Sequence, residues 1–487
     1  MESSLWCRYL LIDLETSDCY DSADLTGHGL FQRKIQILTA LSLAIVVGWS
    51  RAFTLSSPPV DHWCKPPAHL SHLSEAAWKN VGIPLEANGE PSSCNVFLLL
   101  ESYDLSNNSA DVVACEAWDY DKEHADSSVV SSWNLVCHRA WLLPAAEAMR
   151  ASGAVFAAIA AGYAADHAGR KPVIIAATTT LLLATFGVSV LNSYSAYVAI
   201  GIILSGSAGA LFAVTSLLFF ELGTHAHRAR QLCVAIIIGY APISVLFMAL
   251  RQTRLSWSQR QMTMASPTAL APLFYLFVVE SPRWLISTKQ FNRAEAQIAE
   301  AGAANRFGKH AEGVSILKRL RDMAGPKAES LRATLVAVLG ITVVRRRAAI
   351  VFVSSFVVTF AFHALTATAG LTRALGSWVS LAAEAALFGS LLLVLNRLQR
   401  LVTLSANLSL LASCSCLASL AFRIEEEMFG SVFLVLARAF SLTGVTVNYI
   451  YVLELFPTAL RGVFFGTSQA FGRLGATFAA VLKIVSE

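Results

Sequence analysis

The chain has few charged residues. Only 14% of its 487 residues are Asp, Glu, Lys or Arg, whereas 55% are hydrophobic and the mean hydropathy is +0.55. Because water-soluble globular domains carry about 25% charged residues, this composition argues against a soluble protein and indicates that most of the chain contacts lipid. The net charge of +4 is small, and no block of basic residues alternates with aromatic ones, which argues against nucleic acid as a partner.

The sequence also lacks the motifs of membrane enzymes and ATP-driven pumps. It holds no phosphate-binding loop, no metal-ligand cluster and no nucleophile–base pattern. We therefore expect a protein that is not an enzyme and that binds no metal or cofactor. Segments of about ten residues with alternating polarity, which form membrane β-barrels, are absent as well. The first 34 residues contain no basic region followed by a short apolar stretch, so we expect no cleaved signal peptide.

Long apolar runs dominate the chain instead. A helix needs about 20 mostly apolar residues to cross a bilayer, and every backbone polar group in lipid must be bonded within the structure. The runs predict an all-α membrane protein. About eleven spans are expected, near residues 35–55, 142–165, 172–192, 195–221, 230–250, 262–280, 348–369, 376–395, 401–422, 429–453 and 463–485.

Two hydrophilic segments of different charge separate the spans. Segment 56–141 holds about a dozen acidic residues and four basic ones, whereas segment 281–347 holds about a dozen Lys and Arg. Cytoplasmic loops are enriched in Lys and Arg, so we expect segment 56–141 to be external and segment 281–347 to be a cytoplasmic linker. The predicted organisation is a cytoplasmic amino terminus (1–34), a first transmembrane half (35–280), the cytoplasmic linker (281–347) and a second transmembrane half (348–487).

Cysteines and a glycosylation pattern agree with an external segment 56–141. An even number of cysteines in an oxidising compartment predicts disulfides. Asn107 begins a glycosylation sequon in the same segment. The three possible connectivities remain open for the four cysteines, Cys64, Cys94, Cys115 and Cys137.

An internal repeat relates the two halves of the chain. The stretches ELGTHAHR and ELFPTALR, at 221–228 and 454–461, place a Glu and an Arg seven residues apart at the end of a span in each half. At nearly the same offset, the charged loop 166–171 corresponds to 396–400. Parallel repeats build one class of transporter fold. The same offset places a twelfth span beyond residue 487.

Five stretches carry a family resemblance. They are FQRKIQIL, SSWNLVC, GYAADHAGRK, ESPRWLI and NYIYVLELFPTALRG, and they extend over almost the whole chain. The third contains the GxxxDxxGRK pattern of the major facilitator superfamily, and the chain resembles more narrowly the organic cation, anion and zwitterion transporters of the solute carriers. The resemblance implies a major facilitator fold of two pseudo-symmetric six-helix halves in the plasma membrane. It also implies alternating-access transport of a small organic ion.

Charged residues at the helix ends of the repeat are candidates for a conformational latch. A carboxylate there can pair with Arg side chains or with helix ends, and the resemblance implies that such contacts break and form during transport. The alternative is a set of static topology anchors. Because the second-half loop NRLQR lacks the Asp and Gly of its counterpart, we expect a weaker latch there. The candidates are Asp166, Gly169, Arg170, Lys171, Glu221, Arg228, Glu454 and Arg461.

Charged residues inside spans are costly and usually face a cavity, so they are candidates for substrate contact. Arg473 lies near the middle of its span, and a guanidinium binds a carboxylate through two parallel hydrogen bonds. The resemblance implies that Arg at this position accompanies carboxylate substrates, and that Glu384 matches an acidic position of the cation and zwitterion carriers. Both charges in one cavity would suit a zwitterion such as a betaine or a carnitine-like solute. Alternatively, Glu384 and Arg473 pair with each other.

Other residues inside the spans have simpler interpretations. Glu147 and Arg150 share a helix face and can neutralise each other. Arg438 is close enough to the start of its span to reach the interface, and His363 fits a packing residue better than a proton carrier. Four aromatic residues are candidates for an apolar or cation–π wall, namely Phe356, Phe360, Tyr449 and Tyr451.

Three functions therefore remain open. The first is a transporter of organic anions or zwitterions, the second an organic cation transporter, and the third a transporter-like sensor or scaffold without flux. The expected partners are the lipid bilayer and a small organic ion. Flux that depends on Arg473 would separate the first function from the third.

Overall fold

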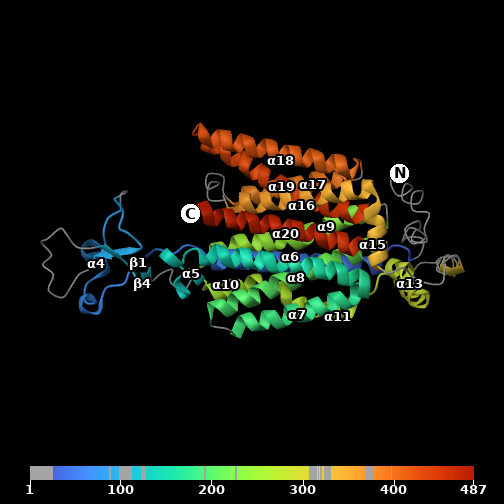
Figure 1. Ribbon diagram of the computed structural model, residues 1–487, viewed down its shortest axis with the longest axis horizontal. Coiled ribbons are helices and arrows are strands. Elements are labelled where there is room, and N and C mark those ends of the chain that lie inside the picture. Colours follow the sequence, from blue (N-terminus) through green and yellow to red (C-terminus); the bar gives the residue numbers. More distant parts are fainter. Residues whose placement is uncertain are drawn as a thin grey trace.

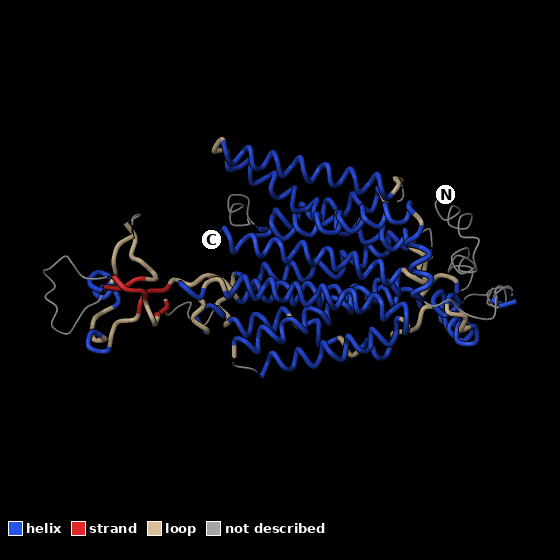
Figure 2. Tube along the Cα trace, viewed as in Figure 1, coloured by secondary structure: helices blue, strands red, loops and turns tan. Residues whose placement is uncertain are grey.

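The computed structural model describes residues 26–486 except for 87–88, 98–111, 122–127, 191–192, 225–226, 307–314, 316, 319–320, 323–330, 368–376 and 396. These residues form a bundle of long helices, with short strands beyond one end and short helices beyond the other (Figures 1 and 2). We call these the β end and the linker end. The predicted glycosylation site Asn107 lies outside the described residues.

Two sets of helices form the bundle. The first set is α3 (Leu30–Ser56), α6 (Leu142–Ala168), α7 (Arg170–Val190), α8 (Tyr194–Leu222), α9 (Arg228–Arg251), α10 (Trp257–Met264), η4 (Ser266–Leu270) and α11 (Leu273–Phe277). The second is α16 (Thr342–Ala367), α17 (Ser377–Val394), α18 (Arg400–Arg423), α19 (Glu427–Leu455) and α20 (Arg461–Ser486). Within the described residues, eight helices are long and apolar enough to cross a membrane, namely α3, α6, α7, α8, α9, α16, α18 and α19. Figure 1 shows α17 and α20 running alongside them.

The sixth predicted span, 262–280, is not one continuous helix. It is divided among the end of α10, the short η4 and the five-residue α11. Pro267 and Pro272 lie at the starts of the last two pieces. Proline has no N–H to donate to the preceding turn, so each proline interrupts the α-helix at this point. Trp49 of α3 stabilises the interruption by donating its indole N–H to the hydroxyl of Thr268, at 3.0 Å.

The two halves meet most closely where α6 packs against α20. A Cβ on Gly162 would collide with the carbonyl oxygen of Gly462, and a Cβ on Gly466 would collide with the carbonyl oxygen of Ala158. Small residues let two membrane helices approach backbone to backbone. The glycines therefore hold α20, which carries Arg473, directly against the first half.

A small domain occupies the β end. Strand β1 (His62–Cys64) pairs antiparallel with β4 (Trp118–Tyr120), and β2 (Asn95–Phe97) pairs antiparallel with β3 (Val112–Ala114). Short helices complete the domain at η1 (Ala68–Leu70), α4 (Glu75–Gly82), α5 (Val129–Ser132) and η3 (Cys137–Arg139). Trp78 is buried in its core and donates its indole N–H to the carbonyl of Cys64, at 2.7 Å.

Two disulfides cross-link this domain. Cys64 is bonded to Cys115, and Cys94 is bonded to Cys137, which is one of the three connectivities that the sequence left open. So small a domain buries little apolar surface, and disulfides commonly make up the difference. His62 lies beside Cys94 and Cys137, but the disulfide removes both thiols as metal ligands.

Short helices of the linker cover the opposite end of the bundle. They are α12 (Pro282–Ser287), α13 (Phe291–Asn305) and α15 (Leu331–Gly340), and α15 runs across the direction of the bundle helices (Figure 1). Asn305 ties α13 to the beginning of α3. Its Oδ1 accepts the N–H of Phe31 at 2.9 Å, and its Nδ2 donates to the carbonyl of Thr26 at 2.8 Å.

Candidate functional site

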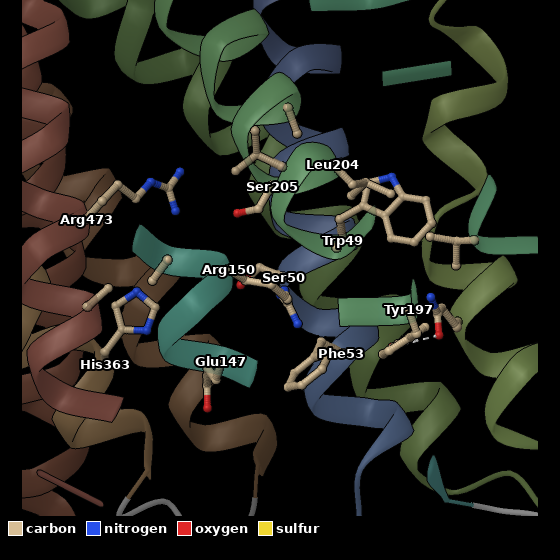
Figure 3. Close-up of a pocket in the computed structure, with 17 residues that line it drawn as sticks. Trp49, Ser50, Phe53, Glu147, Arg150, Tyr197, Leu204, Ser205, His363 and Arg473 are labelled. Carbon is tan, nitrogen blue, oxygen red and sulfur yellow. Dashed lines mark hydrogen bonds between the residues drawn. The ribbon is translucent and has the colours of Figure 1, made fainter. Parts of the chain in front are cut away.

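A cavity of about 80 Å³ lies between the two halves. Side chains of α3, α6 and α8 line one wall, and residues of α16 and α20 line the other (Figure 3). Its charged and aromatic lining comprises Trp49, Phe53, Glu147, Arg150, Tyr197, His363 and Arg473.

Arg473 projects from α20 into this cavity (Figure 3). It lies about three turns after the beginning of α20 at Arg461. A Cβ on Gly209 of α8 would lie 3.7 Å from its Nη2, so the guanidinium faces the first half. Within the described residues the Arg473 guanidinium forms no ion pair. A partly buried cation without a carboxylate is costly, and an anionic ligand would remove that cost.

Arg150 enters the cavity from α6. Its guanidinium carbon lies 3.9 Å from the centroid of the Phe53 ring, which is a cation–π contact. Glu147, one helical turn earlier on α6, also lines the cavity (Figure 3). Neither residue forms an ion pair with any residue that the structure describes. The two charges are neighbours, as their spacing predicted, but they are not directly bonded to each other.

The four aromatic residues predicted to line the site pack elsewhere. Phe356 and Phe360 stack on each other with ring centroids 6.2 Å apart, where α16 packs on α20. Tyr449 packs against two phenylalanine rings, and Tyr451 is 6% exposed in the core. None of the four is among the described residues that line the cavity. Aromatic side chains are equally suited to helix packing, and the sequence pattern does not separate the two roles.

Glu384 belongs to a separate buried network. Its Oε1 lies 3.1 Å from Nη2 of Arg438, and its Oε2 accepts the hydroxyl of Tyr240 at 3.2 Å. Arg51 in turn donates to the Tyr240 hydroxyl at 3.1 Å. The structure therefore does not bring Glu384 and Arg473 together in one cavity. Arg438, which the sequence placed near the interface, balances the Glu384 carboxylate instead.

The aromatic wall of the cavity was missed by sequence reasoning. Phe53 stacks on Tyr197 with ring centroids 6.4 Å apart, and the hydroxyl of Tyr197 donates to Oε1 of Gln261 at 3.2 Å. Trp49 lines the cavity beside them. The one signal available was the polar pair Ser50-Arg51 inside the first span, which marks the face of α3 that turns away from lipid.

A second charged cluster lies at the linker end, around Arg170. Gly169 has a φ of 103° where α6 turns into α7, a conformation that glycine adopts readily. Arg170 is fully buried and donates from Nε and Nη2 to the carboxylate of Glu221, at 3.0 and 2.7 Å. Oδ1 of Asp166 lies 3.2 Å from the same Nη2. One guanidinium thus holds two carboxylates, in part through the strong bidentate geometry.

Contacts of this cluster cross from the first half to the second. The backbone N–H groups of Gly462 and Val463 donate to the Asp166 carboxylate at 3.1 and 2.8 Å. These groups belong to the first turn of α20, where the helix dipole favours a negative charge. Nη1 of Arg461 lies 3.6 Å from Oε1 of Glu221. The two halves are therefore held together at the linker end by charge.

Glu280 of the ESPRWLI stretch joins the same cluster. Its carboxylate accepts the N–H groups of Arg170 and Lys171 at 2.8 and 3.2 Å, so it caps the beginning of α7. Burial raises the pKa of Glu280 above its ordinary value, although these hydrogen bonds and the Arg170 charge oppose the shift. Trp284 donates its indole N–H to the carbonyl of Asp166 at 2.9 Å. The sequence marked this stretch only as part of a resemblance and did not predict its capping role.

The second half contains a more exposed version of the Arg170–Glu221 pair. Nε of Arg400 lies 3.0 Å from Oε2 of Glu454, and both side chains are 21% exposed, compared with 0% for Arg170 and Glu221. An exposed pair is screened by solvent and contributes little. The weaker second latch expected from the NRLQR loop stays a prediction.

Arg228 and Arg461 begin α9 and α20, and each follows a Glu by seven residues in the chain. Glu454 forms an ion pair with Arg400, and Arg461 lies close to Glu221 of the first half. Arg228 is buried, with its guanidinium carbon 4.3 Å from the centroid of a phenylalanine ring in α8. The spacing marked a repeat, and the ion pairs of Glu454 with Arg400 and of Arg461 with Glu221 each join different helices.

Comparisons with known proteins place the chain in a family. The family model described as "Sugar (and other) transporter" matches residues 145–483, which is more than half of the chain. Solute carrier family 22 member 7 from Rattus norvegicus is 24% identical, with 94% of this chain and 88% of the relative covered. Organic cation/carnitine transporter 2 from the same species is 26% identical, with 92% and 83% covered.

Solved structures agree on the fold. The proton:xylose symporter XylE bound to 6-bromo-6-deoxy-D-glucose superimposes with a TM-score of 0.60 at 15% identity, covering 94% of this chain and 89% of that chain. A partially occluded inward-open conformation of XylE from E. coli gives a TM-score of 0.55 at 14% identity, with 94% and 92% covered. The chain belongs to the sugar (and other) transporter family and has the major facilitator fold; it is a multi-pass membrane transporter, not an enzyme, related to the transporters of solute carrier family 22.

Proposed function

We propose that the chain carries small organic anions with a carboxylate group across the membrane by alternating access. The observation that carries this proposal is the guanidinium of Arg473, which faces a cavity between the halves and forms no ion pair within the described residues. A guanidinium binds a carboxylate through two parallel hydrogen bonds. The names of the relatives, which include organic cation and carnitine transporters, support an organic ion as the substrate class.

The charges around the cavity favour an anion over a cation. Arg150 and Arg473 supply two positive charges and Glu147 supplies one negative charge. An organic cation would meet this net positive charge at low dielectric constant, where repulsion is strong. Glu384 is already engaged by Arg438 and does not line the cavity. A cation would therefore have to displace a buried ion pair before it could use that carboxylate.

A zwitterion is the second candidate, and Glu147 is the observation that favours it. A betaine or a carnitine-like solute would place its carboxylate on Arg473 and its quaternary ammonium group near Glu147. Substitution Glu147→Gln separates the two candidates. Zwitterion uptake should fall, whereas uptake of a simple carboxylate should be maintained or should rise because a negative charge has been removed.

The linker-end cluster supports a latch in this cycle. Opening that end requires Asp166 to leave the first turn of α20 and Arg461 to leave Glu221. We place the linker end and the amino terminus in the cytoplasm and the β end outside the plasma membrane, because the linker is rich in Lys and Arg. The structure would then represent the conformation that is closed towards the cytoplasm.

Uptake into cells that express the chain tests the proposal. Labelled carboxylates, betaines and quaternary ammonium ions are compared for the native chain, Arg473→Gln and the control Arg423→Gln, an exposed residue at the end of α18, with surface amounts measured for each. We expect carboxylate uptake to be lost only in Arg473→Gln. Cation uptake that is unchanged by Arg473→Gln would overturn the proposal. Absence of any flux from surface-exposed protein would favour a sensor or scaffold.

A further inference from the structure

We propose that His363 is a proton site coupled to the carboxylate site at Arg473, so that one proton crosses the membrane with each carboxylate. The proposal rests on the function proposed for Arg473, because the carboxylate bound there is what favours the proton. Figure 3 shows His363 of α16 and Arg473 of α20 on the same side of the cavity, and both residues line it.

The imidazole of His363 is placed to exchange a proton with the contents of the cavity. It lines the cavity, and within the described residues it forms no hydrogen bond and no ion pair. A buried histidine that serves only packing ordinarily has a hydrogen-bond partner. The interpretation of His363 as a packing residue, which the sequence favoured, therefore does not account for its position.

Close packing of α16 on α20 holds the two residues in one wall. A Cβ on Gly472 would lie 3.0 Å from Oγ1 of Thr359, and a Cβ on Gly475 would lie 2.5 Å from the carbonyl oxygen of Phe356. Arg473 stands between these two glycines, and His363 follows Thr359 by about one helical turn. The glycines therefore bring the backbones together beside the position from which both side chains enter the cavity.

Charged and titratable groups surround His363 on several helices. Helices α19 and α20 pack against α16, and α3, α6 and α8 line the opposite wall of the cavity. Arg51 and Arg473 act electrostatically on His363, whereas Glu147 acts on Arg150 of its own helix. Within the described residues, His363 thus faces positive charge without a carboxylate that neutralises it. The groups considered are Arg51, Glu147, Arg150, Tyr197, Arg438 (balanced by Glu384), Tyr449 and Arg473.

A carboxylate on Arg473 would change the charge that His363 meets. In the empty cavity a proton on His363 would be repelled by Arg473 and Arg51, and this repulsion is strong at low dielectric constant. A bound carboxylate cancels the charge of Arg473 and offers an acceptor for an imidazole N–H. The carboxylate therefore favours proton binding, and by linkage the proton favours carboxylate binding by the same factor.

The proton and charge balance of the proposed cycle is simple. A proton from water on the side of entry binds a ring nitrogen of His363 when the carboxylate binds Arg473. When the carboxylate leaves on the other side, repulsion from Arg473 and Arg51 is restored and the proton returns to water there. One proton and one monocarboxylate carry no net charge, so a proton gradient would drive the uptake.

Proton uptake on ligand binding tests the coupling directly. Benzoate is added to the purified native chain, to His363→Gln and to the control His72→Gln, an exposed histidine of the β-end domain. A pH indicator in weakly buffered solution near neutral pH measures the protons, and equilibrium dialysis measures the bound benzoate, which is itself ionised at this pH. We expect native and His72→Gln proteins to take up protons with benzoate, and His363→Gln to take up none.

The pH dependence of benzoate affinity gives the second measurement. Between about pH 6 and pH 8, where histidine ordinarily titrates, the affinity of the native chain should fall by up to about tenfold for each pH unit, the limit for one coupled proton. The affinity of His363→Gln should stay constant and should match that of the native chain near pH 8, which also shows that this variant is folded. Arg473→Gln should bind benzoate more weakly at every pH.

The outcomes separate this inference from the function on which it rests. Native binding of benzoate without proton uptake would overturn the proton site and leave the carboxylate site at Arg473 in place. Proton uptake that persists in His363→Gln would also overturn the assignment to His363. Absence of benzoate binding by the native chain would overturn the proposed function, and the inference with it.

Discussion

Substitution Asp166→Asn should open the linker end of the molecule. In the native chain the Asp166 carboxylate accepts two N–H groups from the first turn of α20 and lies 3.2 Å from Arg170. Asparagine has nearly the same shape, but it is uncharged and has one acceptor oxygen. The substitution therefore removes the charge on the helix terminus and one hydrogen bond between the halves, while Glu221 still neutralises Arg170.

The size of the effect follows from these contacts. A hydrogen bond to a charged group contributes about 1.5–3 kcal/mol, and a charge at a helix terminus contributes up to about 2 kcal/mol when partly buried. Because these contributions overlap at one carboxylate, we expect a loss of about 2 kcal/mol from the closed conformation. That loss corresponds to a shift of roughly 30-fold towards an open linker end. The matched substitution Glu454→Gln affects a pair that is 21% exposed, and it should shift the equilibrium by less than about fivefold.

Distances between spin labels measure this shift. Labels at the exposed positions Arg230 and Leu401 report on the beginnings of α9 and α18, one in each half, in protein without other free thiols. The Asp166→Asn protein should show a longer-distance population that is minor in the native protein and in Glu454→Gln. An unchanged distribution in Asp166→Asn, or a larger change in Glu454→Gln, would refute a latch centred on the first half.

Two further predictions concern stability. Because burial raises the pKa of Glu280, the folded chain binds the carboxyl proton of Glu280 more tightly than the unfolded chain does. The contribution of this proton to folding stability is complete below pH 4.5, the ordinary pKa, and it is lost as the pH rises through the raised pKa. Glu280→Gln should remove that part of the pH dependence of Tm in detergent, and an unchanged slope would contradict this assignment. Replacing Cys94 and Cys137 by serine opens a 43-residue loop and should destabilise the β-end domain by about 2–4 kcal/mol. Limited proteolysis of equal amounts of folded native and variant protein tests this loss of stability. Native-like resistance of the variant to proteolysis would contradict the prediction.

The positions of the spans were largely predictable because a bilayer imposes a length on every apolar helix. The run 262–280 was the exception, since hydropathy averages over Pro267 and Pro272 and does not register the missing N–H groups that break the helix. The correspondence of the two halves was also visible in the sequence. Arg170 and Arg400 each bind a Glu at the end of a later helix, Glu221 and Glu454.

The partners of the buried charges were less predictable because they come from distant parts of the chain. Arg473 was recognised as a cavity residue from its mid-span position alone, and the structure places it there. Glu384 has the same kind of position, but Arg438 from another helix neutralises it. Spacing along one helix reveals neighbours on that helix only, so the sequence showed that Glu147 and Arg150 are adjacent without showing that both face the cavity.

Uptake into liposomes that contain the purified chain tests the role of Arg473 most directly. Labelled benzoate and labelled tetramethylammonium are offered to liposomes with native protein, with Arg473→Gln and with Arg423→Gln, at equal protein content. We expect saturable benzoate uptake by the native and Arg423→Gln proteins, and a KM at least about tenfold higher in Arg473→Gln, because a bidentate charged contact is lost. Equal benzoate uptake by all three proteins, or uptake of tetramethylammonium in preference to benzoate, would contradict a carboxylate site at Arg473.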